Sequence, residues 1–234
     1  MKINRVTITG ADNKTNINEM LKIWKQYPFV EWGILFSPKR IGEERYPDFA
    51  WLSNLMAKRV GNPKINLSAH LCGAYTREML MGKTDLIKNF PITGFLELFG
   101  RFQLNFNAEK TDGDCDKFFP LLKKLGWDFI FQHNHSNKMI CNEAIIRKQP
   151  ISFLYDSSGG RGNIASSWKE PFDGFFTGYA GGLSPDNLES ELKKIAQVVG
   201  DDEIWIDTES RVRTNGVLDM EKVKSFLEIA SQYV

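Results

Sequence analysis

The 234-residue sequence lacks a charge excess of either sign, a long apolar run and paired cysteines. With a formal net charge of +1, we expect no binding to nucleic acid or to a membrane surface through the overall field, so any anion needs a local site. No stretch approaches the roughly 20 apolar residues that cross a bilayer, and the N-terminal MKINRVTITG has no signal-peptide core. Cys72, Cys115 and Cys141 form no C-x-x-C pair and leave an odd count, which favours a reducing compartment. We therefore expect a cytoplasmic protein.

Short apolar segments alternate with amphipathic ones along the whole chain. Strands alternating with helices predict parallel βαβ units, and eight units in this length fit a closed (β/α)8 TIM barrel. An open, doubly wound sheet is the alternative. We see no linker or low-complexity tract, so we expect a single domain over residues 1–234. The predicted strands are Arg5–Thr9, Glu31–Phe36, Asn66–Leu71, Arg101–Asn105, Asp128–Gln132, Ser152–Tyr155, Gly174–Tyr179 and Glu203–Ile206.

Several helix ends are marked by capping residues. Ser184-Pro185-Asp186 predicts the start of a helix that ends at Gly200, because serine is a common N-cap and proline suits the first helical turn. Asp219 is expected to cap the last helix, and Gly126 to end the helix after the fourth strand. These helices would cover the outside of the barrel.

In a barrel of this kind the active site lies at the C-terminal ends of the strands, and the loops after strands seven and eight commonly hold phosphate. Glycine lets backbone N–H groups approach an anion closely, and arginine suits phosphate oxygens. The alternative for each glycine pair alone is a tight turn. The predicted phosphate-binding residues come from three adjacent loops, and they are Gly159, Gly160, Gly162, Gly181, Gly182, Ser210 and Arg211.

Asp156 ends the sixth predicted strand, directly before the glycines of LYDSSGGRG. Partial burial at the barrel mouth would raise its pKa and suit it to act as a general acid. The alternative is a turn aspartate that caps the backbone after it.

All three histidines follow predicted strands: His70 the third, and His133 and His135 the fifth. Together with Cys72 they could gather a metal ion for a hydrolase or epimerase, although the ligand set is incomplete. Surface or hydrogen-bonded histidines are the favoured interpretation, so we expect no metal and no cofactor.

The sequence resembles the phosphoribosylanthranilate isomerase family of tryptophan biosynthesis. FLYDSSGGRG is similar to the family's strand-six acid and glycine loop, GYAGGLSPDNL to its strand-seven loop, and IWIDTESRVRTNGVLDMEKVKSFL to its strand-eight segment and last helix. Weaker similarities are TITGADN, ILFSPKRI and FQLNFNAE. The resemblance implies a TIM barrel that carries out an Amadori rearrangement of a phosphosugar.

The resemblance also implies residue roles. Asp156 matches the acid that protonates the ribose ring oxygen, and Thr9 stands where the family has a cysteine that removes the proton at C2. A threonine hydroxyl is too weak a base at neutral pH without a proton-accepting partner, and Cys72, His70 and Asp12 are the candidate replacements. Arg211 replaces a family glycine. The expected substrate-binding residues are Lys39, Arg40, Asn105, His133 and Asp207.

Three functions follow as hypotheses. The first is an isomerase that acts on a small phosphorylated ligand, with Asp156, Thr9 and Cys72 as catalytic residues. The second is a barrel that binds a phosphorylated ligand and has a different reaction or none. The third is the metal-dependent hydrolase or epimerase that uses His70, His133 and His135. The sequence indicates no oligomeric state.

Overall fold

The computed structural model describes residues 1–62, 65–156 and 162–234. Eight parallel strands follow one another around a closed barrel, and β8 pairs with β1 to complete it. The predicted (β/α)8 barrel is therefore confirmed, and the open sheet is wrong. The strands are β1 (Lys2–Thr9), β2 (Val30–Phe36), β3 (Asn66–Cys72), β4 (Arg101–Asn105), β5 (Asp128–His133), β6 (Ile151–Asp156), β7 (Thr177–Ala180) and β8 (Glu203–Thr208).

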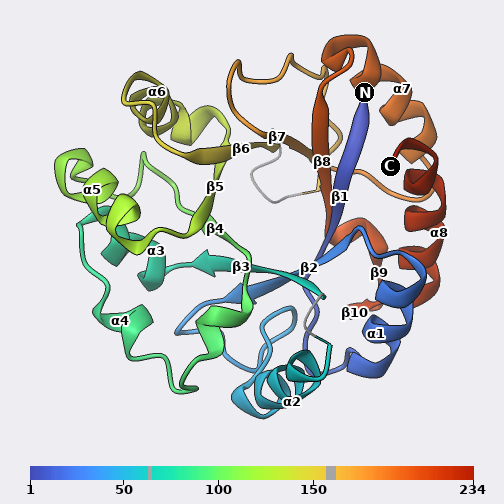
Figure 1. Ribbon diagram of the computed structural model, residues 1–234, viewed down its shortest axis with the longest axis horizontal. Coiled ribbons are helices and arrows are strands. Elements are labelled where there is room, and N and C mark those ends of the chain that lie inside the picture. The colour runs from blue at the N-terminus through green and yellow to red at the C-terminus, as the bar shows by residue number, and fades with distance from the viewer. Residues whose placement is uncertain (63–64, 157–161) are drawn as a thin grey trace.

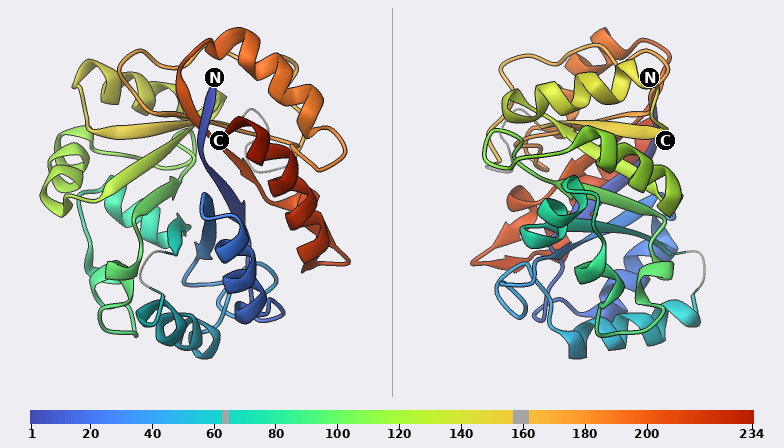
Figure 2. Two further views of the ribbon diagram at one scale, coloured as in Figure 1. Left: turned by 45° about the vertical axis from the view of Figure 1, so that its right-hand side comes forward. Right: turned by 90° about the vertical axis from the view of Figure 1, so that its left-hand side faces the viewer.

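Helices surround the barrel, as Figures 1 and 2 show. Short 3-10 helices at Phe95–Leu98, His135–Asn137, Ser210–Val212 and Ser231–Tyr233 add to them, and a small hairpin of β9 (Arg213–Thr214) and β10 (Val217–Leu218) follows β8. The helices are α1 (Ile17–Gln26), α2 (Phe49–Val60), α3 (Ala74–Leu80), α4 (Asp85–Lys88), α5 (Cys115–Leu125), α6 (Lys138–Ile146), α7 (Leu188–Val199) and α8 (Met220–Ala230).

Several predicted element starts differ from the structure, and the first strand, for example, begins at Lys2 and not at Arg5. Two of the differences have a local cause. The helix expected from Ser184 begins at Leu188, because residues 184–187 form a turn in which Ser184 N donates to Asn187 Oδ1 at 2.8 Å. The seventh strand begins at Thr177 and not at Gly174, because Phe175 N closes a turn by donating to Phe172 O at 2.9 Å. Asp219 caps α8 as predicted, and its side chain accepts hydrogen bonds from the N–H groups of Glu221 and Lys222.

The apolar core lies mainly between the strands and the surrounding helices. Inside the barrel the buried apolar side chains form one small cluster of Ile130, Leu154, Ala180 and Trp205. Much of the remaining interior is polar, and it includes a buried ion pair between Glu31 and Arg101. The fold therefore places polar groups along the inside of the barrel, below its C-terminal mouth.

Within the described part of the chain, none of the helices is long and apolar enough to span a membrane.

Candidate active site

A cavity of about 230 Å³ opens at the C-terminal ends of the strands. Side chains from all eight barrel strands line it. Residues of the loops that follow β2, β6, β7 and β8 line it as well. Of the predicted site residues that the structure describes, those that line this cavity are Thr9, Cys72, Asn105, Asp156, Gly162, Gly181, Gly182, Asp207, Ser210 and Arg211.

Asp156 is the last residue of β6 and is buried in the cavity wall. Alternation along the strand turns Leu154 and Asp156 to the inside of the barrel, since successive strand residues face opposite sides. Gln132, from the neighbouring β5, donates from Nε2 to Asp156 Oδ2 at 3.4 Å. The carboxyl group is thus held at the cavity by a neutral donor.

The loops after β6, β7 and β8 meet at one side of the cavity. Gly182 has a φ of +69°, and a Cβ there would lie 2.5 Å from Ile164 N, so a side chain would push the two loops apart. Gly162 likewise abuts Ser210, and Arg211 Nε donates to Gly162 O at 3.2 Å. Gly159 and Gly160 lie outside the described residues. Gly162 and Gly182 are therefore required by the close packing of these loops against one another.

Thr9 and Asp207 are hydrogen-bonded across the junction of β1 and β8. Thr9 Oγ1 donates to Asp207 Oδ1 at 3.0 Å, and both residues are buried. Burial raises the pKa of Asp207 well above its usual range, and the nearby carboxyl groups of Glu209 and Asp156 add to that effect although the Thr9 hydrogen bond opposes it. The Thr9 hydroxyl is therefore held by a buried carboxyl group at the cavity.

Cys72 ends β3 and faces the same cavity from the other side of the barrel. Its Sγ accepts a hydrogen bond from Asn105 Nδ2 at 3.3 Å, and Asn105 Oδ1 accepts one from Gln103 Nε2 at 2.9 Å. Burial raises the pKa of the thiol, and the hydrogen bonds from Asn105 and Tyr46 act against that rise. Burial prevails, so the pKa of the thiol is raised overall, and Sγ also donates to the His70 carbonyl oxygen at 3.7 Å.

His70 lies deeper in the barrel, at the base of the cavity. It is 1% exposed, and its Nε2 has no hydrogen-bond partner among the residues described. Burial lowers the pKa of His70 to about 4, so the imidazole is neutral at pH 7. Gly33 provides the space for this arrangement: a Cβ at that position would lie 2.5 Å from Thr9 Oγ1 and 3.0 Å from His70 Nε2.

The other two histidines do not join His70. The His133 ring packs outside the barrel, 4.9 Å from the ring of Phe172, and His135 is almost fully exposed near Glu109. In the described ranges, no group of three or more His, Cys, Asp or Glu side chains is arranged to hold a metal ion. His133, expected to bind substrate, therefore lies apart from the cavity.

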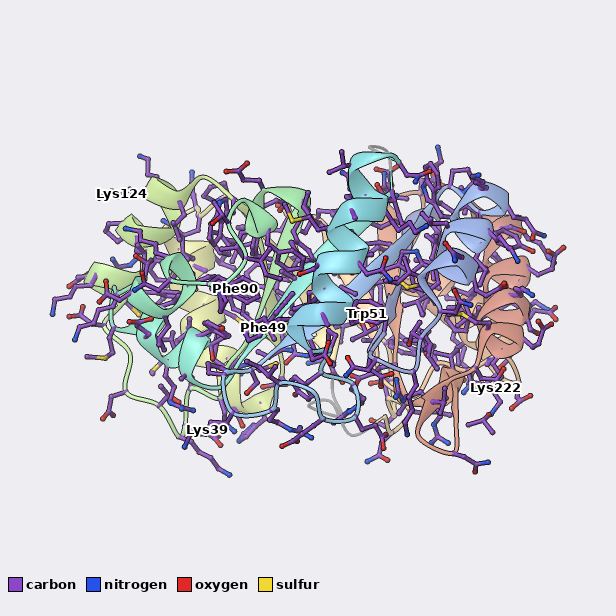
Figure 3. The ribbon with its side chains drawn as sticks, turned by 90° about the horizontal axis from the view of Figure 1, so that it is seen from below. Lys39, Phe49, Trp51, Phe90, Lys124 and Lys222 are labelled. Atoms are coloured by element: carbon purple, nitrogen blue, oxygen red, sulfur yellow. The ribbon has the colours of Figure 1, made fainter. Side chains whose placement is uncertain are left out.

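The expected cations of the loop after β2 also lie elsewhere. Lys39 is exposed at the edge of the molecule (Figure 3), and Arg40 pairs with Glu43 at 2.8 Å outside the cavity. Arg45 lines the cavity instead, and its Nη1 lies 2.6 Å from Glu209 Oε1. The backbone of Arg45 has a φ of +72°, which is uncommon for a residue with a side chain and often marks a functional position.

Asp12, a candidate replacement base, does not line the cavity. Its Oδ2 accepts hydrogen bonds at 2.8 Å from Arg213 Nη2 and from the backbone N–H of Arg45. Asp12 therefore holds two mouth loops together.

Sequence reasoning missed several residues that line the cavity, among them the polar Arg45, Tyr46, Gln103 and Gln132. Gln103 lies two residues before Asn105 on the same strand, so the alternation of strand faces would have indicated it. Arg45 and Tyr46 sit in a loop of 12 residues between β2 and α2, where no such rule applies.

Comparison with known proteins agrees with this geometry. Residues 122–229 match the family model described as N-(5'-phosphoribosyl)anthranilate (PRA) isomerase. The N-(5'-phosphoribosyl)anthranilate isomerase of Wickerhamomyces anomalus is 33% identical over 122 residues, and the matched stretch covers 50% of this chain and 48% of that protein. The match therefore spans about half the length of this curated relative.

Two solved structures show the same fold over nearly the whole chain. Phosphoribosylanthranilate isomerase from Thermotoga maritima has a TM-score of 0.58 at 18% identity, with 97% of this chain and 98% of that chain covered. 3-Hexulose-6-phosphate synthase from Salmonella typhimurium has a TM-score of 0.52 at 11% identity, and both chains are covered completely. The fold and its mouth thus define a (β/α)8 barrel with a polar C-terminal cavity. Within that class, residues 122–229 of the chain are similar to the phosphoribosylanthranilate isomerase family.

Proposed function

We propose that this protein is an aldose–ketose isomerase of the Amadori type that acts on a phosphorylated sugar. The observation that carries the proposal is the convergence of Asp156 with the glycines after β6 and β7 and with the loop after β8 in one cavity. A proton donor and an anion-binding rim are what this reaction requires at the two ends of a phosphosugar. The family match over residues 122–229 covers these same loops.

The phosphate group would bind where the three loops meet. Gly162, Gly181 and Gly182 bring backbone close to the site, and Ser210 and Arg211 add a hydroxyl group and a guanidinium group. Arginine and backbone N–H groups are suitable partners for phosphate oxygens. Because the chain carries almost no net charge, this local site would supply most of the attraction.

The isomerisation needs one acid and one base. Asp156 would give its proton to the sugar ring oxygen, which opens the ring to an imine, and a base would then remove the proton at C2. We assign that base to Cys72, because its sulfur faces the cavity and accepts a hydrogen bond from Asn105 that offsets part of the rise in pKa caused by burial. Thr9 would then orient Asp207 and the substrate hydroxyls, since its own proton is donated to Asp207.

The non-phosphate half of the substrate would meet Arg45. This guanidinium group lines the cavity, while Lys39 and Arg40 lie outside it. A carboxylate on the substrate would compete with Glu209 for Arg45, and burial already raises the pKa of Glu209 despite the nearby guanidinium group. Substrates with a carboxylate on the amine substituent, such as N-(5'-phosphoribosyl)anthranilate, fit this arrangement.

The test is the turnover of N-(5'-phosphoribosyl)anthranilate by the wild type and three variants, with substrate and product separated by chromatography. We expect Asp156→Asn and Cys72→Ser to lose at least roughly a hundredfold in kcat, as is common when an acid or base is removed. Asp112→Asn, which changes an exposed loop carboxyl group, is the matched control and should retain activity.

Turnover and binding measurements together distinguish the isomerase from a phosphate-binding barrel without this reaction. Wild-type turnover no faster than that of Asp156→Asn would refute the isomerase. If ribose 5-phosphate still bound, and Gly182→Ala weakened that binding, the second hypothesis of a phosphate-binding barrel without this reaction would stand in its place.

A further inference from the structure

The connection between β6 and β7 has no helix among its described residues, 162–176, in contrast to most other crossovers of the barrel (Figure 1). Aromatic side chains cover the outer face of these strands instead. The ring of Phe172 stacks on Tyr155 at 4.9 Å with an interplanar angle of 16°, and Trp168 meets Tyr179 edge to face at 5.8 Å. A loop covers the sheet less completely than a helix, and a hollow remains beside it.

That hollow is a cavity of about 340 Å³, which we call the side cavity. Its walls include Tyr155, Trp168, His133 and Lys138, and the rings of His133 and Tyr155 meet edge to face at 5.3 Å. For comparison, an engineered cavity of about 150 Å³ in another protein binds benzene. The side cavity thus has room for an aromatic ring with a polar substituent, and aromatic rings already form its walls.

The charged side chains that line the side cavity are cationic, although Glu109 and Glu191 contact two of its lining residues, His135 and Trp168, from outside the lining. Lys138 and Lys169 line it, and no carboxyl group does so among the described residues. Burial lowers the pKa of His133, and the positive charges of Lys169 and Lys138 lower it further, so this imidazole is neutral at pH 7. The lysine ammonium groups would supply the attraction for an anion. The described lining has no arginine and therefore no guanidinium group for a bidentate contact, so the anion would be held by the charge of the two lysines.

We propose that the side cavity is a binding site for a small aromatic carboxylate. The ring would lie against Tyr155 and Trp168, and the carboxylate would face Lys138 and Lys169. This proposal does not rest on the proposed isomerase function, because Ala180 is the only described residue that lines both cavities.

The side cavity also has a physical connection to the mouth. Ala165 lines it, and the preceding Asn163 and Ile164 are the residues whose backbone abuts Gly182. A ligand in the side cavity would therefore contact the same short segment that borders the glycine loop after β7.

The experiment is a titration of the full chain with benzoate, in which isothermal titration calorimetry measures the affinity. Cyclohexanecarboxylate keeps the charge without the aromatic ring, and benzamide keeps the ring without the charge. We expect both to bind more weakly than benzoate. Lys138→Gln and Lys169→Gln should each weaken benzoate binding by roughly fivefold, the scale of a partly exposed ion pair. Lys25→Gln, on the opposite side of the barrel in α1, is the matched control and should leave the affinity unchanged.

Arg45→Gln identifies the cavity that benzoate occupies. Weaker binding in the Lys138 and Lys169 variants, with wild-type affinity in Lys25→Gln, supports the side cavity. A loss confined to Arg45→Gln would assign benzoate to the central cavity and overturn the proposal. Equal affinity for benzoate, cyclohexanecarboxylate and benzamide would overturn it too, as would an absence of benzoate binding at millimolar concentrations.

Discussion

Two glutamate–arginine pairs mark the two ends of the barrel interior, and they differ in geometry and burial. Arg101 donates two hydrogen bonds to Glu31, from Nε to Oε2 at 3.0 Å and from Nη2 to Oε1 at 2.5 Å. Both side chains are at most 2% exposed. At the mouth, Arg45 makes a single contact with Glu209, and these side chains are 31% and 23% exposed.

The pKa values of the two glutamates move in opposite directions. Burial by itself would raise the pKa of Glu31, but the charge and hydrogen bonds of Arg101 outweigh it and bring the pKa down to about 2. At Glu209 burial prevails over Arg45, and the pKa is raised. A bidentate buried pair therefore holds its glutamate charged and stabilises the barrel. A pair with one contact at a cavity leaves its arginine suited to exchanging one carboxylate for another.

The largest effect should come from breaking the buried pair. We expect Arg101→Met to lower the free energy of unfolding by about 3–5 kcal/mol, because it leaves Glu31 buried with only the partly exposed Arg5 and the Thr7 hydroxyl as partners. Urea denaturation measures the loss. The double variant Glu31→Met/Arg101→Met should recover most of it, since the unpaired charge is removed. Equal losses in the single and double variants would contradict this interpretation.

A second, smaller effect should appear as the pH falls. The unfolded chain binds a proton at His70 near pH 6.5, whereas the folded protein does so only near pH 4. Stability should therefore fall by up to about 3 kcal/mol between pH 6.5 and 4. Glu31, with its folded pKa of about 2, extends the loss from about pH 4.5 downward. Urea denaturation of the wild type at pH 7, 6, 5 and 4 gives the slope.

The comparison for this slope is His70→Asn. Its stability should fall less than that of the wild type between pH 6.5 and 5, and the difference between the two slopes measures His70, because the raised pKa values of Asp207 and Glu209 act on both proteins alike. A wild-type slope in His70→Asn would mean that other groups titrate in this range.

The smallest effect on stability should come from the mouth pair. We expect Arg45→Gln to change the free energy of unfolding by less than about 1 kcal/mol, since the pair is partly exposed. If Arg45 binds a substrate carboxylate, the same variant should raise KM by roughly tenfold to a hundredfold, the scale of a hydrogen bond to a charged group. Arg40→Gln, which changes an arginine outside the cavity, is the matched control for the kinetic assay. A large loss of stability in Arg45→Gln would remove the contrast between the two pairs.

The barrel itself could be predicted because eight short apolar runs alternate with amphipathic helices, and Asp156 could be located because it ends one of these runs. Which residues of β5 face the cavity could not be predicted. Its residues Phe129, Ile130 and Phe131 are all apolar, so the period of two gives no contrast between inside and outside. Gln132 faces the cavity and His133 the surrounding layer, although either would suit a binding site.

The cation at the mouth could not be predicted for a different reason. Lys39, Arg40 and Arg45 share one loop, and the path of that loop depends on contacts with distant residues. Arg45 takes a positive φ, and its backbone N–H donates to Asp12, which is 33 residues earlier in the chain. Local sequence rules do not reach contacts of this kind.

The space at Gly33 has a consequence for redesign of the site. Thr9 and His70 come from the strands on either side of Gly33, and both side chains pack against it. The space available at each of the three positions therefore depends on the other two. A larger residue at position 33 would displace the threonine hydroxyl and the imidazole together. A search for variants that restore a cysteine at position 9 should therefore vary positions 9, 33 and 70 jointly, because the best partner at each depends on the other two.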